Sequence, residues 1–84
     1  IDIITKKNNI LIFFEVKTLK ENKIGFCPED QMTQRKIKRL KKICQYFVLN
    51  NSELIHDKYG WQIDLIAIYI NNKNNYTIKH YENI

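Results

Sequence analysis

The chain opens with two segments whose residues favour β-strands. Residues 1–5 form an apolar run interrupted by one acid, and residues 10–17 are rich in strand-forming residues. The polar stretch Lys6-Lys7-Asn8-Asn9 between them contains the residue types of a turn. The pattern predicts a β-hairpin at the start of the chain.

A helix is expected in the middle of the chain. Residues 20–29, which include Gly25 and Pro28, show no period and predict a loop, after which Thr33 is suited to cap a helix. Apolar residues then recur at three- and four-residue spacing, which places one apolar stripe along a helix ending near Leu49. The stripe consists of Ile37, Leu40, Cys44 and Phe47.

Two further strands follow this helix. Residues 61–70 form another β-rich run, and an Asn-rich turn at residues 71–75 leads to a last strand near residues 76–81. The predicted order is therefore ββαββ, an α/β arrangement, and 84 residues fit one small domain that covers residues 1–84. The chain begins inside an apolar run without an initiator Met, so we interpret it as a fragment.

The hairpin brings three charged residues to one face of the sheet. With its turn centred on residues 7–8, antiparallel pairing sets Asp2 opposite Phe13. Side chains alternate along a strand, so Glu15 and Lys17 project to the side that Asp2 occupies, with Glu15 as its diagonal neighbour. A register slip of one residue would move Asp2 to the other face.

Two carboxylates and an amine in one place suit a Mg²⁺ site. Mg²⁺ is commonly held by one or two carboxylates while water and a substrate phosphate complete its shell. Asp2 and Glu15 could be those ligands, and Lys17 could orient an attacking water or stabilise the transition state. The alternative is that Asp2 is a terminal charge and that Glu15 and Lys17 form a weak ion pair where the strand emerges into solvent.

The predicted helix also carries a strongly basic face beside its apolar stripe. The residues of this face are Arg35, Lys36, Lys38, Arg39, Lys41 and Lys42. Together with the net charge of +5, this face suits a polyanion such as DNA, because Lys and Arg displace the counterions of phosphates. A solvated helix face is the alternative explanation for the same charges.

We expect a cytoplasmic protein. No apolar run is long enough to cross a membrane, and no signal peptide opens the chain. Cys27 and Cys44 do not have the CxxC spacing, so we expect free thiols.

The remaining titratable residues offer weaker signals. His56 and His80 have no second His or Cys at ligand spacing, so we expect no zinc site and interpret both as structural or exposed. Asp64 falls within a predicted buried strand, where it needs a partner such as a Lys or Arg. We favour an internal ion pair or exposure at a strand end over contact with a metal.

Five separated segments carry a further signal, in order along the chain. They are Ile1-Asp2-Ile3-Ile4, then Phe13-Phe14-Glu15-Val16-Lys17-Thr18, then Pro28-Glu29 through Thr33 with Arg35-Lys36 and Leu40, then residues 61–68 around Asp64, and finally His80-Tyr81-Glu82-Asn83. In these segments the chain resembles the YraN-type family of small bacterial predicted endonucleases, which is similar to archaeal Holliday-junction resolvases and other PD-(D/E)XK nucleases. It departs from the family pattern at Leu19 and at Gln62-Ile63.

The resemblance implies a restriction-endonuclease-like mixed β-sheet flanked by helices, here without the first helix and first strand of the family. It implies Asp2, Glu15 and Lys17 as catalytic residues, with Mg²⁺ or Mn²⁺ held by Asp2, Glu15 and the backbone carbonyl of Val16. Lys36 would face the substrate from near the helix start, beside the binding residues Lys38, Arg39, Lys41 and Lys42. The missing strand would expose a sheet edge and favour a homodimer.

The sequence thus predicts a metal-dependent DNA endonuclease that hydrolyses phosphodiester bonds, with branched or damaged DNA as its substrate. Two other functions fit the same residues. One is a catalytically inactive nucleic-acid-binding module of the same fold, and the other is a protein-interaction or dimerisation module that acts through the sheet edge.

Overall fold

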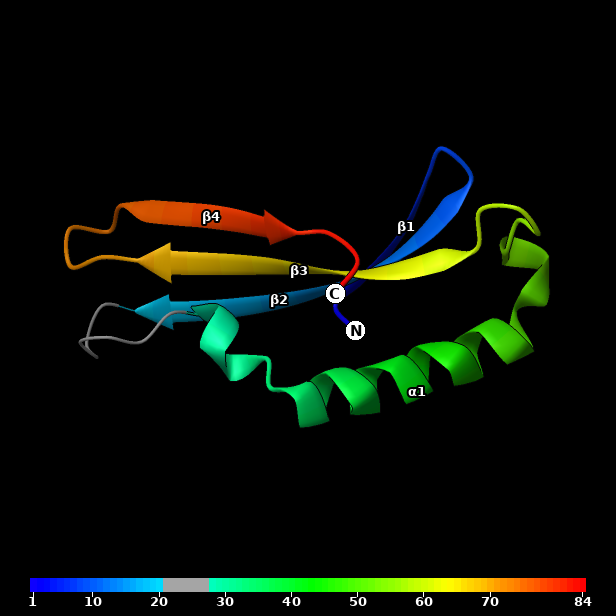
Figure 1. Ribbon diagram of the computed structural model, residues 1–84. Coiled ribbons are helices and arrows are strands. Elements are labelled where there is room, and N and C mark those ends of the chain that lie inside the picture. Colours follow the sequence, from blue (N-terminus) through cyan, green and yellow to red (C-terminus); the bar gives the residue numbers. More distant parts are fainter. Residues whose placement is uncertain (21–27) are drawn as a thin grey trace.

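The computed structural model describes residues 1–20 and 28–84. In this part of the chain four strands form one sheet, and one long helix lies along one side of it (Figure 1). The elements are β1 (Ile3–Lys7), β2 (Ile10–Lys20), the 3₁₀ helix η1 (Pro28–Gln31), α1 (Gln34–Asn50), the 3₁₀ helix η2 (Ser52–Leu54), β3 (Trp61–Ile70) and β4 (Tyr76–Tyr81). The predicted ββαββ order is confirmed. Positions 21–27, which hold most of the predicted loop with Gly25 and Cys27, lie outside the described residues.

The sheet is mixed. Its strand order is β1-β2-β3-β4, with antiparallel pairs β1–β2 and β3–β4 and a parallel pair β2–β3. A parallel pair needs a crossover connection, and the segment that contains α1 provides it. This α/β arrangement is consistent with a restriction-endonuclease-like fold that lacks some of its elements.

The register of the β1–β2 hairpin corrects the prediction from sequence. Ile4 pairs with Phe13 and Lys7 with Ile10, so the turn consists of Asn8 and Asn9, one residue further along the chain than expected. Both Asn residues have positive φ, 52° and 67°, as a two-residue type I′ turn requires. Because the pairing shifts by two residues, every side chain keeps the face that the sequence assigned to it.

The core lies between the sheet and α1. Phe13 of β2 is fully buried and makes edge-to-face contacts with Phe47 of α1 at 5.6 Å and with Trp61 of β3 at 5.5 Å between ring centroids. Leu40 and Cys44 of α1 are buried in the same cluster, which confirms the predicted apolar stripe. Cys44 is a free thiol, and burial raises its pKa to about 11.

The helix begins where the sequence predicts. Thr33 is the N-cap, and its hydroxyl Oγ1 accepts a hydrogen bond of 3.2 Å from the Lys36 N–H. The buried stripe then turns the basic residues of α1 outward or along its flanks, because residues three and four apart share one face of a helix. Thr33 and the stripe therefore determine which way the charged residues point.

Candidate active site

Asp2 and Glu15 lie opposite each other at the point where β1 begins. Ile3 pairs with Phe14, so the next cross-strand position in the same register is Asp2 facing Glu15. Asp2 precedes the paired residues of β1, and its N–H donates to the carbonyl oxygen of Phe14, the partner of Ile3, at 2.9 Å. Asp2 is thus the direct neighbour of Glu15 and not the diagonal one that the sequence predicted.

The carboxylate of Asp2 turns back onto β2. Its Oδ2 accepts a hydrogen bond of 2.8 Å from the Val16 N–H. In a strand, the N–H and C=O groups of one residue point to the same side, so the Val16 carbonyl oxygen also projects toward the side where Asp2 lies. Three oxygen-bearing groups, from Asp2, Glu15 and Val16, therefore gather where β1 begins.

The two carboxyl groups have opposite pKa shifts. The Val16 N–H, and then a hydrogen bond with Glu15, hold the pKa of Asp2 below its ordinary 3.8. Burial, and then the hydrogen bond with Asp2, raise the pKa of Glu15 above its ordinary 4.5, and only 15% of the Glu15 side chain is exposed. The pair behaves as a coupled unit in which Asp2 ionises first and Glu15 retains a proton longer.

Lys17 stands two residues beyond Glu15 on the same face of β2, and its side chain is half-buried. Its positive charge lowers the pKa of both Asp2 and Glu15. Glu15 and Lys17 line one hollow between the sheet and the first turns of α1, which we call the carboxylate hollow. Its lining residues are Ile1, Glu15, Lys17, Met32, Lys36, Arg39, Leu40 and Ile43.

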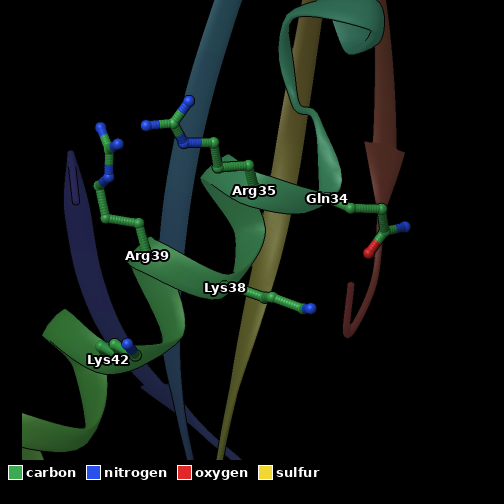
Figure 2. Close-up of a pocket in the computed structure, with 5 residues that line it drawn as sticks. All are labelled: Gln34, Arg35, Lys38, Arg39 and Lys42. Carbon is green, nitrogen blue, oxygen red and sulfur yellow. The ribbon is translucent and has the colours of Figure 1, made fainter.

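A second hollow lies on the outside of α1, and we call it the outer hollow. It is lined by Gln34, Arg35, Lys38, Arg39 and Lys42. Figure 2 shows Arg35 and Arg39 extending toward the side of the helix where β1 and β2 lie, while Lys38 extends the other way. Of the five predicted binding residues, Lys36 and Arg39 line the carboxylate hollow, Lys38, Arg39 and Lys42 line the outer hollow, and Lys41 lines neither.

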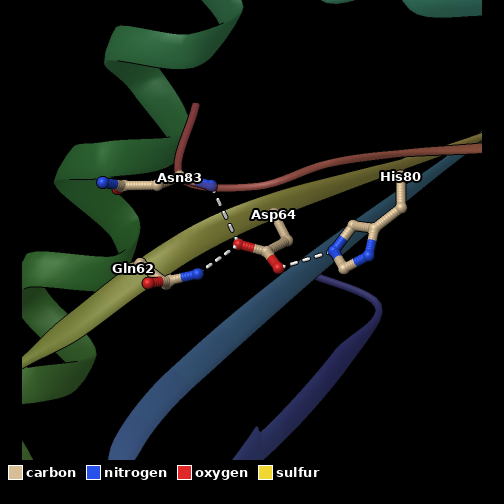
Figure 3. Close-up of polar contacts among 4 residues, drawn as sticks. All are labelled: Gln62, Asp64, His80 and Asn83. Carbon is tan, nitrogen blue, oxygen red and sulfur yellow. Dashed lines mark hydrogen bonds and ion pairs between the residues drawn. The ribbon is translucent and has the colours of Figure 1, made fainter.

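Asp64 belongs to a separate polar cluster. It is 1% exposed, and its carboxylate accepts hydrogen bonds from Gln62 Nε2 at 2.8 Å and the Asn83 N–H at 3.0 Å and contacts His80 Nε2 at 2.7 Å (Figure 3). The expected Lys or Arg partner is therefore wrong, and the imidazole of His80, whose side chain is 42% exposed, takes that place. Burial raises the pKa of Asp64, but the three contacts together lower it below the ordinary 3.8.

This second cluster faces away from the first. Asp64 pairs with Phe14 across β2 and β3, and the side chains of Phe14 and Glu15 point to opposite faces of the sheet. The His80 ring lies 5.8 Å from the Phe14 ring on that same face. Asp64 therefore binds β3 to β4 and to the closing segment, and it does not join Asp2 and Glu15.

A family model covers residues 1–68, which include Asp2, Glu15, Lys17 and the whole of α1. The chain belongs to the uncharacterised protein family UPF0102. Among its curated UPF0102 relatives, a protein from Caldicellulosiruptor bescii is 39% identical over 77 residues, and one from Clostridium botulinum is 34% identical over 84 residues. These alignments cover 92% and 99% of this chain but only 62% and 66% of the relatives, so the chain spans about two thirds of their length.

No solved structure matches this UPF0102 chain significantly. No helix in the described part of the chain has both the length and the apolar character that crossing a bilayer requires. Within residues 1–20 and 28–84, no group of three or more His, Cys, Asp or Glu side chains is placed to hold a metal ion. A cation at Asp2 and Glu15 would therefore rely on main-chain and water oxygens for its remaining ligands.

The sequence did not identify the partners of Asp64 in this UPF0102 chain, although two signals were present. Gln62 and Asp64 are two positions apart on one strand, which places them on one face. The closing His80-x-x-Asn83 segment lies beside them, so two of the segments that carried the family resemblance meet in space. His56 has a local role, because its Nδ1 accepts a 3.1 Å hydrogen bond from the Lys58 N–H.

Proposed function

We propose that this UPF0102 chain carries the catalytic residues of a metal-dependent DNA endonuclease of the YraN type, which hydrolyses phosphodiester bonds. One observation carries the proposal: Asp2 and Glu15 lie close enough where β1 begins for each carboxyl group to shift the pKa of the other, with Lys17 next along the same face. Two acids can hold a divalent cation, and an amine can stabilise charge that develops on the phosphate, as metal-assisted phosphodiester hydrolysis requires. Branched and damaged DNA are the substrates that we propose.

The donor set fits a hard divalent cation. Burial is the main cause of the raised pKa of Glu15, and the neighbouring Asp2 carboxyl raises it further, so Glu15 favours its protonated form. A cation held by Asp2, Glu15 and the Val16 carbonyl oxygen would replace that proton. When bound there, Mg²⁺ or Mn²⁺ would offset negative charge on the scissile phosphate and acidify a water molecule.

The protein supplies the remaining groups. The Lys17 ammonium is half-buried beside Glu15, where it can hold an attacking water in position or stabilise charge that develops on the phosphate. Lys36 and Arg39 line the same hollow and present donors to the non-bridging phosphate oxygens. Asp2 and Glu15 would thus hold the metal ion, while the basic side chains of Lys36 and Arg39 on α1 hold the substrate.

A catalytically inactive DNA-binding module is the second function that the structure favours. The outer hollow has three basic residues besides Arg39 and contains no acid among its lining residues, so it can bind a polyanion without the carboxylates. This function predicts that DNA affinity falls as the salt concentration rises and that no metal-dependent cleavage product forms. Binding would then depend on Arg35, Lys38 and Lys42 and not on Asp2.

A dimerisation module is the third. β1 and β4 form the two edges of the described sheet, and every residue in both strands is exposed. An exposed edge can pair with a strand of another chain. This function predicts a concentration-dependent homodimer with no affinity for DNA.

The deciding experiment is a titration of Mg²⁺ and Mn²⁺ against supercoiled, linear and four-way-junction DNA. It would use this chain and the longer relative from C. bescii, each with Asp2→Asn or Glu15→Gln at the corresponding position. Glu53→Gln, an exposed acid on η2, is the matched control. Metal-dependent cleavage that Asp2→Asn and Glu15→Gln abolish and Glu53→Gln retains supports the proposal, and DNA binding without cleavage in both proteins overturns it.

A further inference from the structure

Arg39 is shared by the two hollows on α1. It lines the carboxylate hollow together with Glu15, Lys17 and Lys36, and it also lines the outer hollow. Within residues 1–20 and 28–84, no carboxylate forms an ion pair with Arg39, and its side chain is exposed. Its guanidinium is therefore available to an external anion.

The basic residues of the outer hollow form a continuous row along α1, which we call the path. Arg35, Arg39 and Lys42 follow one another at four- and three-residue spacing, which places them on one stripe. Arg39 stands between the other two, and the four residues from Arg39 to Arg35 rise about 6 Å, which corresponds to the axial rise of about two nucleotides at ~3.4 Å each. Figure 2 shows the side chains of Arg35 and Arg39 reaching the same flank of the helix.

We propose that one nucleic-acid strand runs from the carboxylate hollow over Arg39 and onto the outer hollow. Arg39 is then a positioning residue that binds the phosphate beside the scissile one. A guanidinium suits this role because its planar fork donates two parallel hydrogen bonds to one phosphate. The inference rests on the proposed nuclease function and deepens it, because it predicts that the substrate needs about three nucleotides on one side of the cut, one at Arg39 and about two between Arg39 and Arg35.

Lys41 provides a charge-matched comparison on the same helix. Two positions along a helix differ by about 200° in direction, so Lys41 projects away from Arg39. Lys41 lines neither hollow. Neutralising it removes the same charge from the protein without interrupting the path.

The test uses DNA oligonucleotides with flanks of one to six nucleotides beside a fixed cleavage position. It compares this chain with its variants Arg39→Gln, Arg39→Lys and Lys41→Gln, with binding measured over a range of salt concentrations. For the unmodified protein we expect affinity to rise until the flank reaches about three nucleotides. Arg39→Gln should flatten this dependence, lower the slope of log affinity against log salt by about one, and raise KM more than it lowers kcat.

The two comparison variants sharpen the result. Arg39→Lys keeps the charge but not the fork, so it should recover the salt slope and only part of the flank dependence. Lys41→Gln should lose some affinity at low salt and keep the flank dependence. Equal flank dependence in Arg39→Gln and Lys41→Gln would overturn the inference even if cleavage still requires Lys17. Absence of metal-dependent cleavage would instead overturn the nuclease function, and flank-dependent binding through Arg39 would still support the path.

Discussion

The carboxyl groups of Asp2 and Glu15 shift each other's pKa in opposite directions where β1 begins beside β2, with that of Asp2 lowered and that of Glu15 raised. The backbone N–H of Val16 favours the ionised form of Asp2, while burial favours the neutral form of Glu15. The pair can therefore hold one proton between two acids. A divalent cation would compete for the same position.

Replacing Asp2 with Asn should lower the pKa of Glu15. Both the hydrogen bond with Asp2 and its negative charge raise that pKa, whereas burial, the largest cause, remains in the variant. The fall should thus be partial. Carboxyl-carbon NMR titration measures it directly, with Glu53→Gln as the control, and an unchanged Glu15 pKa in Asp2→Asn would show that the two acids are not coupled.

The variant Glu15→Gln should be more stable than the unmodified protein at neutral pH. Because the folded-state pKa of Glu15 lies above 4.5, ionising the group costs stability as pH rises through 4.5 and the folded value. Gln cannot ionise, so the two proteins should differ little below pH 4.5 and diverge above it. Urea unfolding across this pH range measures the difference, and a variant that is less stable at neutral pH contradicts the expectation.

Asp64→Ala should destabilise the fold by roughly 1–3 kcal/mol, because it leaves the partly buried Gln62 amide and Asn83 N–H donors without their acceptor. The pKa of Asp64 is lowered, so its contribution is complete above its ordinary 3.8 and is lost as pH falls through the folded value. The gap between the variant and the unmodified protein should therefore narrow below pH 3.8. Thermal unfolding checks this, and an equal loss in the exposed-site control Asp57→Ala would contradict it.

The turn at Asn8 and Asn9 should control the carboxylate pair through the register of the hairpin. Asn9 has φ of 67°, which a β-branched side chain adopts only under strain. Asn9→Val should therefore cost about 1–3 kcal/mol, whereas Asn9→Gly should be tolerated. Chemical denaturation compares the two variants, and similar stabilities would mean that the turn does not require this conformation.

Much of the fold follows from patterns that the sequence displays locally. Runs of strand-forming residues located the strands, apolar residues at three- and four-residue spacing located α1, and Thr33 marked the start of the helix. The hairpin register was wrong by two residues because either Lys7-Asn8 or Asn8-Asn9 is polar enough for a turn. Only the positive φ of both Asn residues distinguishes the two.

The candidate site, like the fold, could be predicted from the sequence only in part. Glu15 and Lys17 share a face by alternation alone, and Asp2 joined them because a two-residue shift preserves faces. The partners of Asp64 could not be derived, since His80 and Asn83 lie 16 and 19 residues away and reach it only through the β3–β4 pairing. The division of the basic face into two hollows likewise depends on how α1 docks against the sheet.

The most direct test of the central claim is the effect of Lys17→Ala on Mg²⁺-dependent cleavage of branched DNA by this chain. The control is Lys73→Ala, which changes an exposed lysine in the β3–β4 turn. We predict that Lys17→Ala lowers the cleavage rate by about 10²–10³-fold while DNA binding and Mg²⁺ binding persist, because a stabilising group has been removed from the transition state. Lys73→Ala should cleave at the unmodified rate. Equal cleavage by both variants would contradict a catalytic role for the cluster of Asp2, Glu15 and Lys17.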